Sequence, residues 1–108
     1  MKKAHIIKNL EENLGLDTAD AVEIFESYRC ALKDNIRIMQ QGLSPENIEI
    51  VARASHSIKG CALNCGDEEM ATTAKLAQLA ALSKDFNSFD DAFEKIKNMA
   101  LEVFSDKV

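Results

Sequence analysis

Residues 51–66, with the sequence VARASHSIKGCALNCG, decide the fold. If this segment is helical, at about 100° per residue, its apolar side chains fall within roughly 60° on either side of Ile58. These side chains are Val51, Ala54, Ile58, Cys61, Ala62 and Cys65. Gly66 can end the helix, because glycine readily adopts the left-handed conformation of a C-terminal cap. The pattern predicts an amphipathic helix with one buried stripe.

The opposite side of this helix centres on a histidine. His56 lies about 160° from Ile58 on the helical wheel, so we expect it to be exposed. The residues that share this side are Ala52, Arg53, Lys59, Gly60 and Leu63. Lys59 and Gly60, at i+3 and i+4, flank His56 directly. A glycine within a helix costs about 1 kcal/mol relative to alanine, so an exposed Gly60 indicates that another molecule approaches closely here.

On both sides of this segment, glycine, proline and helix-capping residues divide the chain into one short helix and four longer ones. We expect the first at about 2–13, the second from Asp17 or Thr18 to about 41, and the fourth at about 67–83. The third helix is predicted to start with Ser44 as its N-cap. Pro45 and Glu46 then supply the proline and the acidic residue that are common in a first turn.

The last two helices differ in how clearly their patterns indicate a core face. The fifth helix is expected to begin at Ser88, with Asp91 three residues later. Its predicted stripe comprises Phe89, Phe93, Ile96, Ala100 and Val103. The fourth helix has two apolar stripes and its core face stays open. One stripe comprises Met70, Ala74, Ala77 and Ala81, and the other comprises Leu76, Leu79 and Leu82.

The composition favours a single helical domain over residues 1–108. The chain has 46% hydrophobic residues, four glycines and one proline, which is enough for one core and few helix breaks. Connections of a few residues favour antiparallel neighbours. The predicted fold class is therefore all-α, an antiparallel up-down-up-down four-helix bundle with a short additional N-terminal helix.

Charge and hydropathy exclude several classes of partner. The formal net charge is −5, and no dense run of Lys or Arg suits nucleic acid. No apolar run approaches the roughly 20 residues of a membrane span, and the start of the chain is not signal-like. We expect a soluble, cytoplasmic monomer without cofactor.

Three cysteines, Cys30, Cys61 and Cys65, have no disulfide-framework spacing and are expected to be reduced.

The run from Ala54 to Gly66 resembles the phosphoacceptor helix of histidine phosphotransfer domains. The family pattern is His-x-x-Lys-Gly, followed by small residues and a closing glycine, and His56, Lys59, Gly60 and Gly66 match it in register. The number and order of the helices are also similar across essentially the whole chain. Two positions depart from the family: Ser55 replaces a common alanine, and Gln78 stands about where many members have glutamate.

The resemblance implies a phosphorelay intermediate of a two-component system. His56 would be the phosphoacceptor and Lys59 would stabilise the phosphate, while Gly60, Leu63, Ala52 and Arg53 would form the docking surface. The implied partners are a response-regulator receiver domain and a sensor or hybrid histidine kinase. The chain has no Gly-rich phosphate loop, so we expect no kinase activity of its own.

Three alternatives compete with this interpretation. A metal site of His56, Cys61 and Cys65 is disfavoured because the cysteines are expected to point inward, away from His56. A redox switch through the two cysteines is disfavoured because buried thiols are usually inert. A non-catalytic helical module that docks a signalling partner through the His56 side remains open.

Overall fold

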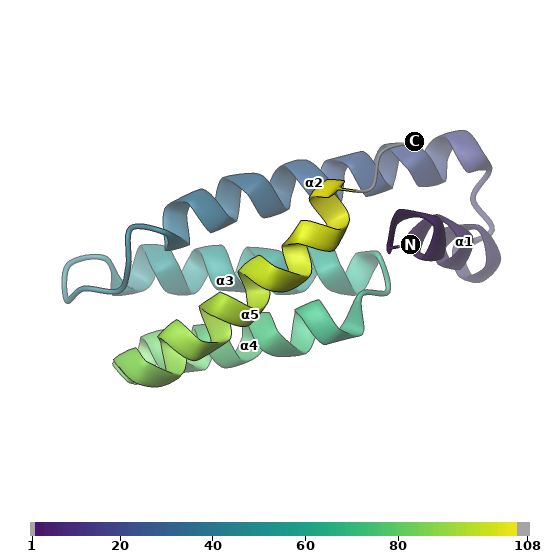
Figure 1. The fold of residues 1–108 in the computed structure, drawn as a ribbon. Coiled ribbons are helices and arrows are strands. Elements are labelled where there is room, and N and C mark those ends of the chain that lie inside the picture. The colour runs from purple at the N-terminus through teal and green to yellow at the C-terminus, as the bar shows by residue number, and fades with distance from the viewer. Residues whose placement is uncertain (1, 106–108) are drawn as a thin grey trace.

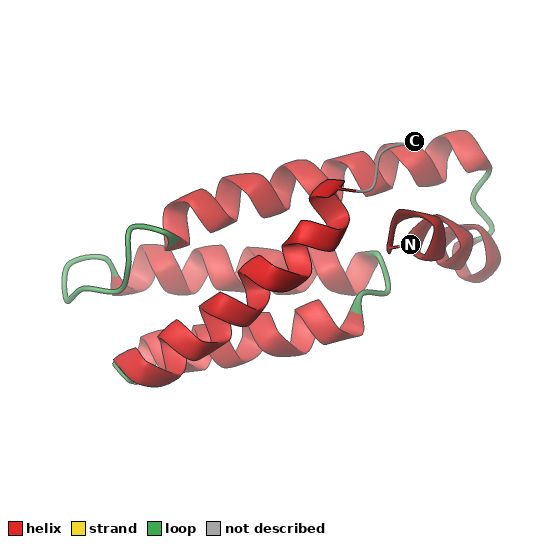
Figure 2. Cartoon of the chain, viewed as in Figure 1, coloured by secondary structure: helices red, strands yellow, loops and turns green. Residues whose placement is uncertain are grey.

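Five α-helices and no strand make up residues 2–105, the part of the chain that the computed structural model describes (Figures 1 and 2). The helices are α1 (Lys2–Leu14), α2 (Thr18–Met39), α3 (Ile48–Asn64), α4 (Glu68–Leu82) and α5 (Phe86–Ser105). The predicted all-α class is therefore confirmed for these residues. Most predicted helix ends differ from the observed ones by only one or two residues.

Helix α3 lies between two neighbours. It packs against α4 on one side and α2 on the other, and α5 packs mainly on α4. In the view of Figure 1, α5 runs obliquely in front of α3 and α4, and α1 covers one end of the longer helices. The molecule is elongated, with principal extents of 44 × 23 × 18 Å. This arrangement leaves the outer side of α3 uncovered.

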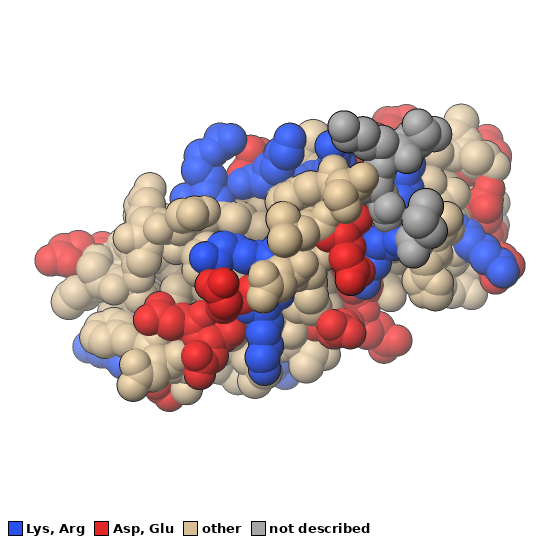
Figure 3. Space-filling view, in the orientation of Figure 1, with Lys and Arg blue, Asp and Glu red and all other residues tan. Residues whose placement is uncertain are grey.

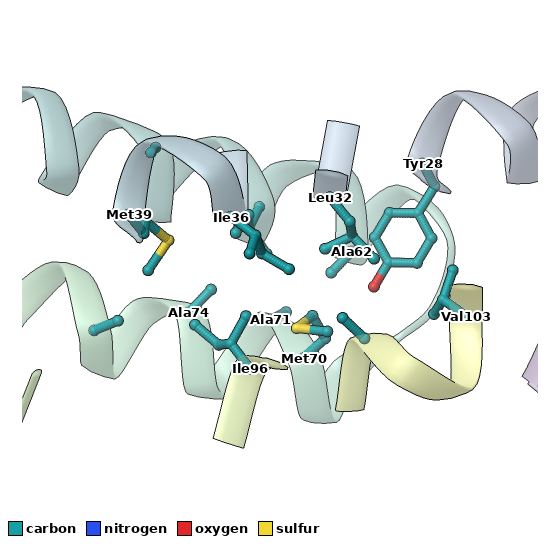
Figure 4. Close-up of a cluster of buried hydrophobic side chains, with 14 of the residues drawn as sticks. Tyr28, Leu32, Ile36, Met39, Ala62, Met70, Ala71, Ala74, Ile96 and Val103 are labelled. Carbon is teal, nitrogen blue, oxygen red and sulfur yellow. The ribbon is translucent and has the colours of Figure 1, made fainter. Parts of the chain in front are cut away.

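The core is formed by one stripe from each long helix, and Figure 4 shows side chains from α2, α3, α4 and α5 meeting there. All five residues of the predicted α5 stripe are buried. In α2 the buried residues are Ala21, Phe25, Tyr28, Leu32, Ile36 and Met39. Val22 is only half-buried, so its neighbour Ala21 begins the buried stripe of α2.

Two predicted helix starts are wrong, and side-chain hydrogen bonds explain both. Helix α3 begins at Ile48, after Ser44 and Pro45. The Asn47 side chain accepts a hydrogen bond from the Ser44 amide at 2.7 Å and donates one to the Gly42 carbonyl at 2.6 Å. These bonds hold 42–47 as a loop, so the expected proline start is lost.

Helix α5 begins at Phe86, two residues before the predicted start. The Asp85 carboxylate accepts hydrogen bonds from the Ser88 amide at 3.1 Å and from the Ser88 hydroxyl at 2.7 Å. These two bonds lower the pKa of Asp85, because they stabilise its charged form. Asp85 therefore caps the start of α5, three residues before Ser88.

The structure also decides which side of α4 faces the core. Met70, Ala74, Ala77 and Ala81 are buried, together with Ala71 and Ala80. The second apolar stripe points to solvent: Leu76 is 56% exposed, Leu79 52% and Leu82 54%. Small side chains on the inner face allow a close approach to α3 and α5, because the distance between packed helices depends on the side chains at the contact.

A buried carboxylate fixes the turn between α3 and α4. Asp67 accepts a hydrogen bond from the Tyr28 hydroxyl at 2.7 Å, and its other oxygen lies 3.0 Å from the Lys2 ammonium. The same oxygen caps α4 by accepting from the Met70 amide at 3.4 Å. The Asn9 side chain donates to the Cys65 carbonyl at 3.4 Å. Helices α1 and α2 are thereby joined to the end of α3.

Gly66 and Gly60 form a matched pair for testing this turn. Gly66 has φ +72°, and a Cβ there would overlap the Asn9 side chain, whereas a Cβ on helical Gly60 would meet nothing within 4 Å. We expect Gly66→Ala to lower the free energy of unfolding by about 1–2 kcal/mol. Gly60→Ala should raise it by up to about 1 kcal/mol. Urea denaturation measures both values, and an equal effect of the two substitutions would contradict the assignment.

Burial at the same turn predicts a loss of stability at alkaline pH. Burial, then the neighbouring Cys61, raises the pKa of the Cys65 thiol from 9.0 to about 12. Burial, then the hydrogen bond to Asp67, raises the pKa of Tyr28 above its usual value of 10.0. The pKa of each group is higher in the folded state than in the unfolded state. The contribution of that group to the free energy of unfolding is therefore complete below its unfolded-state pKa, and it is lost as the pH rises above that value.

Between pH 8 and pH 10 the free energy of unfolding should therefore fall by about 1 kcal/mol through Cys65. Denaturant titrations at several pH values should show this fall in the wild type and in Cys30→Ala, whose thiol is exposed. In Cys65→Ala only the smaller fall due to Tyr28, which begins near its unfolded pKa of 10.0, should remain. A fall of the same size in Cys65→Ala would assign it to another group.

Candidate functional site

His56 lies on the uncovered side of α3, near the middle of the helix. Its side chain is exposed. Within residues 2–105 the ring forms no hydrogen bond or ion pair. Both ring nitrogens are therefore free to meet a ligand or a partner.

Two neighbours one turn away share this side of the helix. Lys59 is half-buried and forms no ion pair with any described residue, so its ammonium is available to an anion beside His56. Gly60 is exposed, and a Cβ added to it would meet no atom within 4 Å. Neither packing nor backbone conformation within this part of the chain requires a glycine at position 60.

The outer residues of α3 agree with the predicted wheel, with one exception. Arg53 is exposed, and Leu63 is 57% exposed. Ala52 was expected beside them, but it is only 5% exposed, so that expectation is wrong. Because α3 packs against both α2 and α4, it buries a wider arc than a wheel centred on Ile58 allows.

Ser55 shows the same widening of the buried arc. It is fully buried, and its hydroxyl donates a hydrogen bond to the Val51 carbonyl at 3.0 Å and lies 3.8 Å from the Met39 sulfur. A buried serine that bonds to its own helix needs no partner from elsewhere. This explains how serine can stand where the family commonly has alanine.

The cysteines of α3 lie on the α2 side of the helix. Cys65 is buried, while Cys61, which we expected in the core stripe, is half-buried. Both line a small cavity of about 110 Å³ together with Tyr28. Among the described residues, no group of three or more His, Cys, Asp or Glu side chains could hold a metal ion.

Sequence reasoning missed the contacts that fix the end of this helix. Asp67 was expected only at the start of the fourth helix, yet it is the acceptor for Tyr28 and Lys2. The only signal was its position after Gly66, where a helix cap is common. The pairing with Tyr28, which is 39 residues away, has no local signature.

The fold and this surface define a class: a helical protein that presents an exposed histidine, flanked by a lysine and a glycine, on one helix. The family model of the Hpt domain matches residues 4–105, essentially the whole chain. The chain belongs to the Hpt domain family. Searches of curated proteins and of solved structures gave no significant match.

Membership of this family defines the kind of chemistry involved. Hpt domains carry out histidine phosphotransfer in two-component phosphorelay signalling, where they interact with receiver domains and histidine kinases. They carry the phosphoryl group and are not kinases. In the described residues no helix is long and apolar enough to cross a membrane.

Proposed function

We propose that this protein is a phosphorelay intermediate that carries a phosphoryl group on His56. The group would be exchanged with the aspartate of a response-regulator receiver domain and would originate from a sensor or hybrid histidine kinase. The chain contains two histidines, and both lie within the segment that matches the family. His5 is followed by Lys8 and Asn9 at i+3 and i+4, whereas His56 is followed by Lys59 and Gly60.

The observation that carries this proposal is the free, exposed imidazole of His56 beside an available lysine. A ring nitrogen of a neutral imidazole can attack the phosphorus of an aspartyl phosphate. The nitrogen–phosphorus bond forms, the phosphorus–oxygen bond to the aspartate breaks, and the aspartate leaves as a carboxylate. The Lys59 ammonium would contact the phosphoryl oxygens. Reversal of the same step returns the group to a receiver.

The partner would supply the remaining charge neutralisation. Phosphoryl transfer depends mainly on positioning and electrostatic stabilisation, so a receiver with its own metal ion and lysine needs only an accessible nucleophile. Gly60 gives a partner loop room to approach, and Leu63 and Arg53 would contact it on the same side. Ala52 is not part of this proposed surface, since it is buried.

The same proposal includes the architecture and state of the protein. We propose a single domain over residues 1–108, folded as an antiparallel up-down-up-down four-helix bundle with α1 as the additional helix. Figure 1, in which successive long helices reverse direction, supports this topology. A cytoplasmic monomer would suit exchange between separate signalling proteins.

Replacing His56 by glutamine tests the phosphoacceptor directly. Incubation with a phosphorylated receiver domain, or with a hybrid kinase and radiolabelled ATP, should label the wild type and His5→Gln but not His56→Gln. The label should be acid-labile and base-stable, as expected of a phosphoramidate. Label retained by His56→Gln would refute the proposal, and absence of label from several donors would favour a docking module without phosphotransfer.

Lys59 and Gly60 should affect the rate of transfer and not the ability to be labelled. We expect Lys59→Gln to slow transfer from a phosphorylated receiver by about tenfold, which corresponds to about 1.4 kcal/mol for one charge-assisted contact. Gly60→Ala should slow it as well, because the added methyl group meets the partner and not this chain. Rapid-quench kinetics measure both rates. Wild-type rates in both variants would remove these residues from the site.

A further inference from the structure

Helix α4 presents an apolar surface that the His56 site does not use. Leu76, Leu79 and Leu82 are each more than half exposed, and Phe86, just beyond the helix, is 47% exposed. Burying one such leucine side chain is worth about 1.5–3 kcal/mol, yet α4 uses alanines for its core contacts. A cluster of large exposed apolar side chains on one element is typical of an interaction surface.

Two of these leucines line a groove between α4 and α5. The groove has a volume of about 430 Å³, and its apolar wall is formed by Leu76, Leu79, Ala80 and Ala92. We call it the α4–α5 groove. Its lining includes none of the outer residues of α3, so it is separate from the His56 side. Along α4 it extends from Thr73 to Ser83, about 15 Å, which matches roughly three turns of a bound helix.

The polar rim of the α4–α5 groove is predominantly acidic at one end. Asp85, which caps the start of α5, and Asp91, in the second turn of that helix, line it, and both are exposed. Asp91 forms no ion pair with any described side chain. Figure 3 shows acidic side chains gathered over the first half of α5. Lys95, one turn after Asp91, lies toward the other end of the α4–α5 groove. There it also lines a neighbouring pocket together with Glu69.

This charge pattern distinguishes between possible occupants. Two copies of the chain that met through their grooves would bring together two linings that each carry two aspartates and only one lysine, in a protein of net charge −5. Like charges that face each other disfavour such an interface. A basic partner, in contrast, would be attracted to the acidic rim as it approaches and would complement its charge once bound. The α4–α5 groove is therefore suited to an apolar segment with a basic end.

We propose that the α4–α5 groove docks an amphipathic helix of a partner protein. The apolar side of that helix packs on Leu76 and Leu79, and its Lys or Arg residues face Asp85 and Asp91. Helices that bind in such grooves present anchors at i, i+3, i+4 and i+7. This docking leaves the outer side of α3 free.

A designed peptide tests the groove without knowledge of the natural partner. The probe is a fluorescent 14-residue helix with leucines at i, i+3, i+4 and i+7 and two lysines at one end. We expect Leu79→Ser and Asp91→Asn each to weaken its binding at least fivefold in fluorescence anisotropy. The matched controls Leu101→Ser and Glu102→Gln change an exposed leucine and an exposed acid of α5 outside the groove, and they should remain within twofold of the wild type.

Several results would overturn the proposal. These are no measurable binding, equal weakening by the α5 controls, or equal binding of a peptide with glutamates in place of the lysines. A wild-type dimer in sedimentation that Leu79→Ser dissociates would identify a second copy as the occupant. Circular dichroism melts of all variants verify folding, which these exposed positions should preserve. The phosphotransfer assay is independent of every one of these results.

Discussion

The burial of one side of α3 against both α2 and α4 is the constraint on which the rest of the structure depends. Ala54, Ile58 and Ala62 are buried there, and even Ser55 and Ala52 at the edges of the stripe are enclosed. Two neighbours cover α3 and leave a strip along its outer side uncovered. His56, Gly60 and Leu63 occupy that strip. The orientation of the histidine is therefore a consequence of core packing.

The end of α3 is held by polar contacts that complement this packing. Asp67 is nearly inaccessible to solvent, and it connects Tyr28 of α2, Lys2 of α1 and the first turn of α4. A buried carboxylate is costly unless its hydrogen bonds are satisfied, so these partners must be present together. The short first helix thus contributes to the position of α3 although it lies at one end of the molecule.

The sequence was sufficient to predict what depends on helical periodicity. The five helices, the α5 stripe and the exposure of His56, Gly60 and Leu63 all follow from spacing along a single helix. The burial of Ala52 did not follow, because it depends on how many neighbours α3 has. The core face of α4 was also undecided, since both of its sides are apolar and only packing against α3 and α5 selects the alanines. The starts of α3 and α5 depended on side-chain hydrogen bonds of Asn47 and Asp85, which periodicity does not encode.

The environments of the three thiols have a consequence for exposure to oxidants. The thiolate is the form that reacts with peroxides and alkylating reagents. Burial keeps the Cys65 thiol protonated at neutral pH, so the residue that caps the C-terminal end of α3 resists attack. Cys30 is exposed on α2 and is the cysteine that a maleimide dye would reach first. A fluorophore attached there would leave the outer side of α3 unmodified.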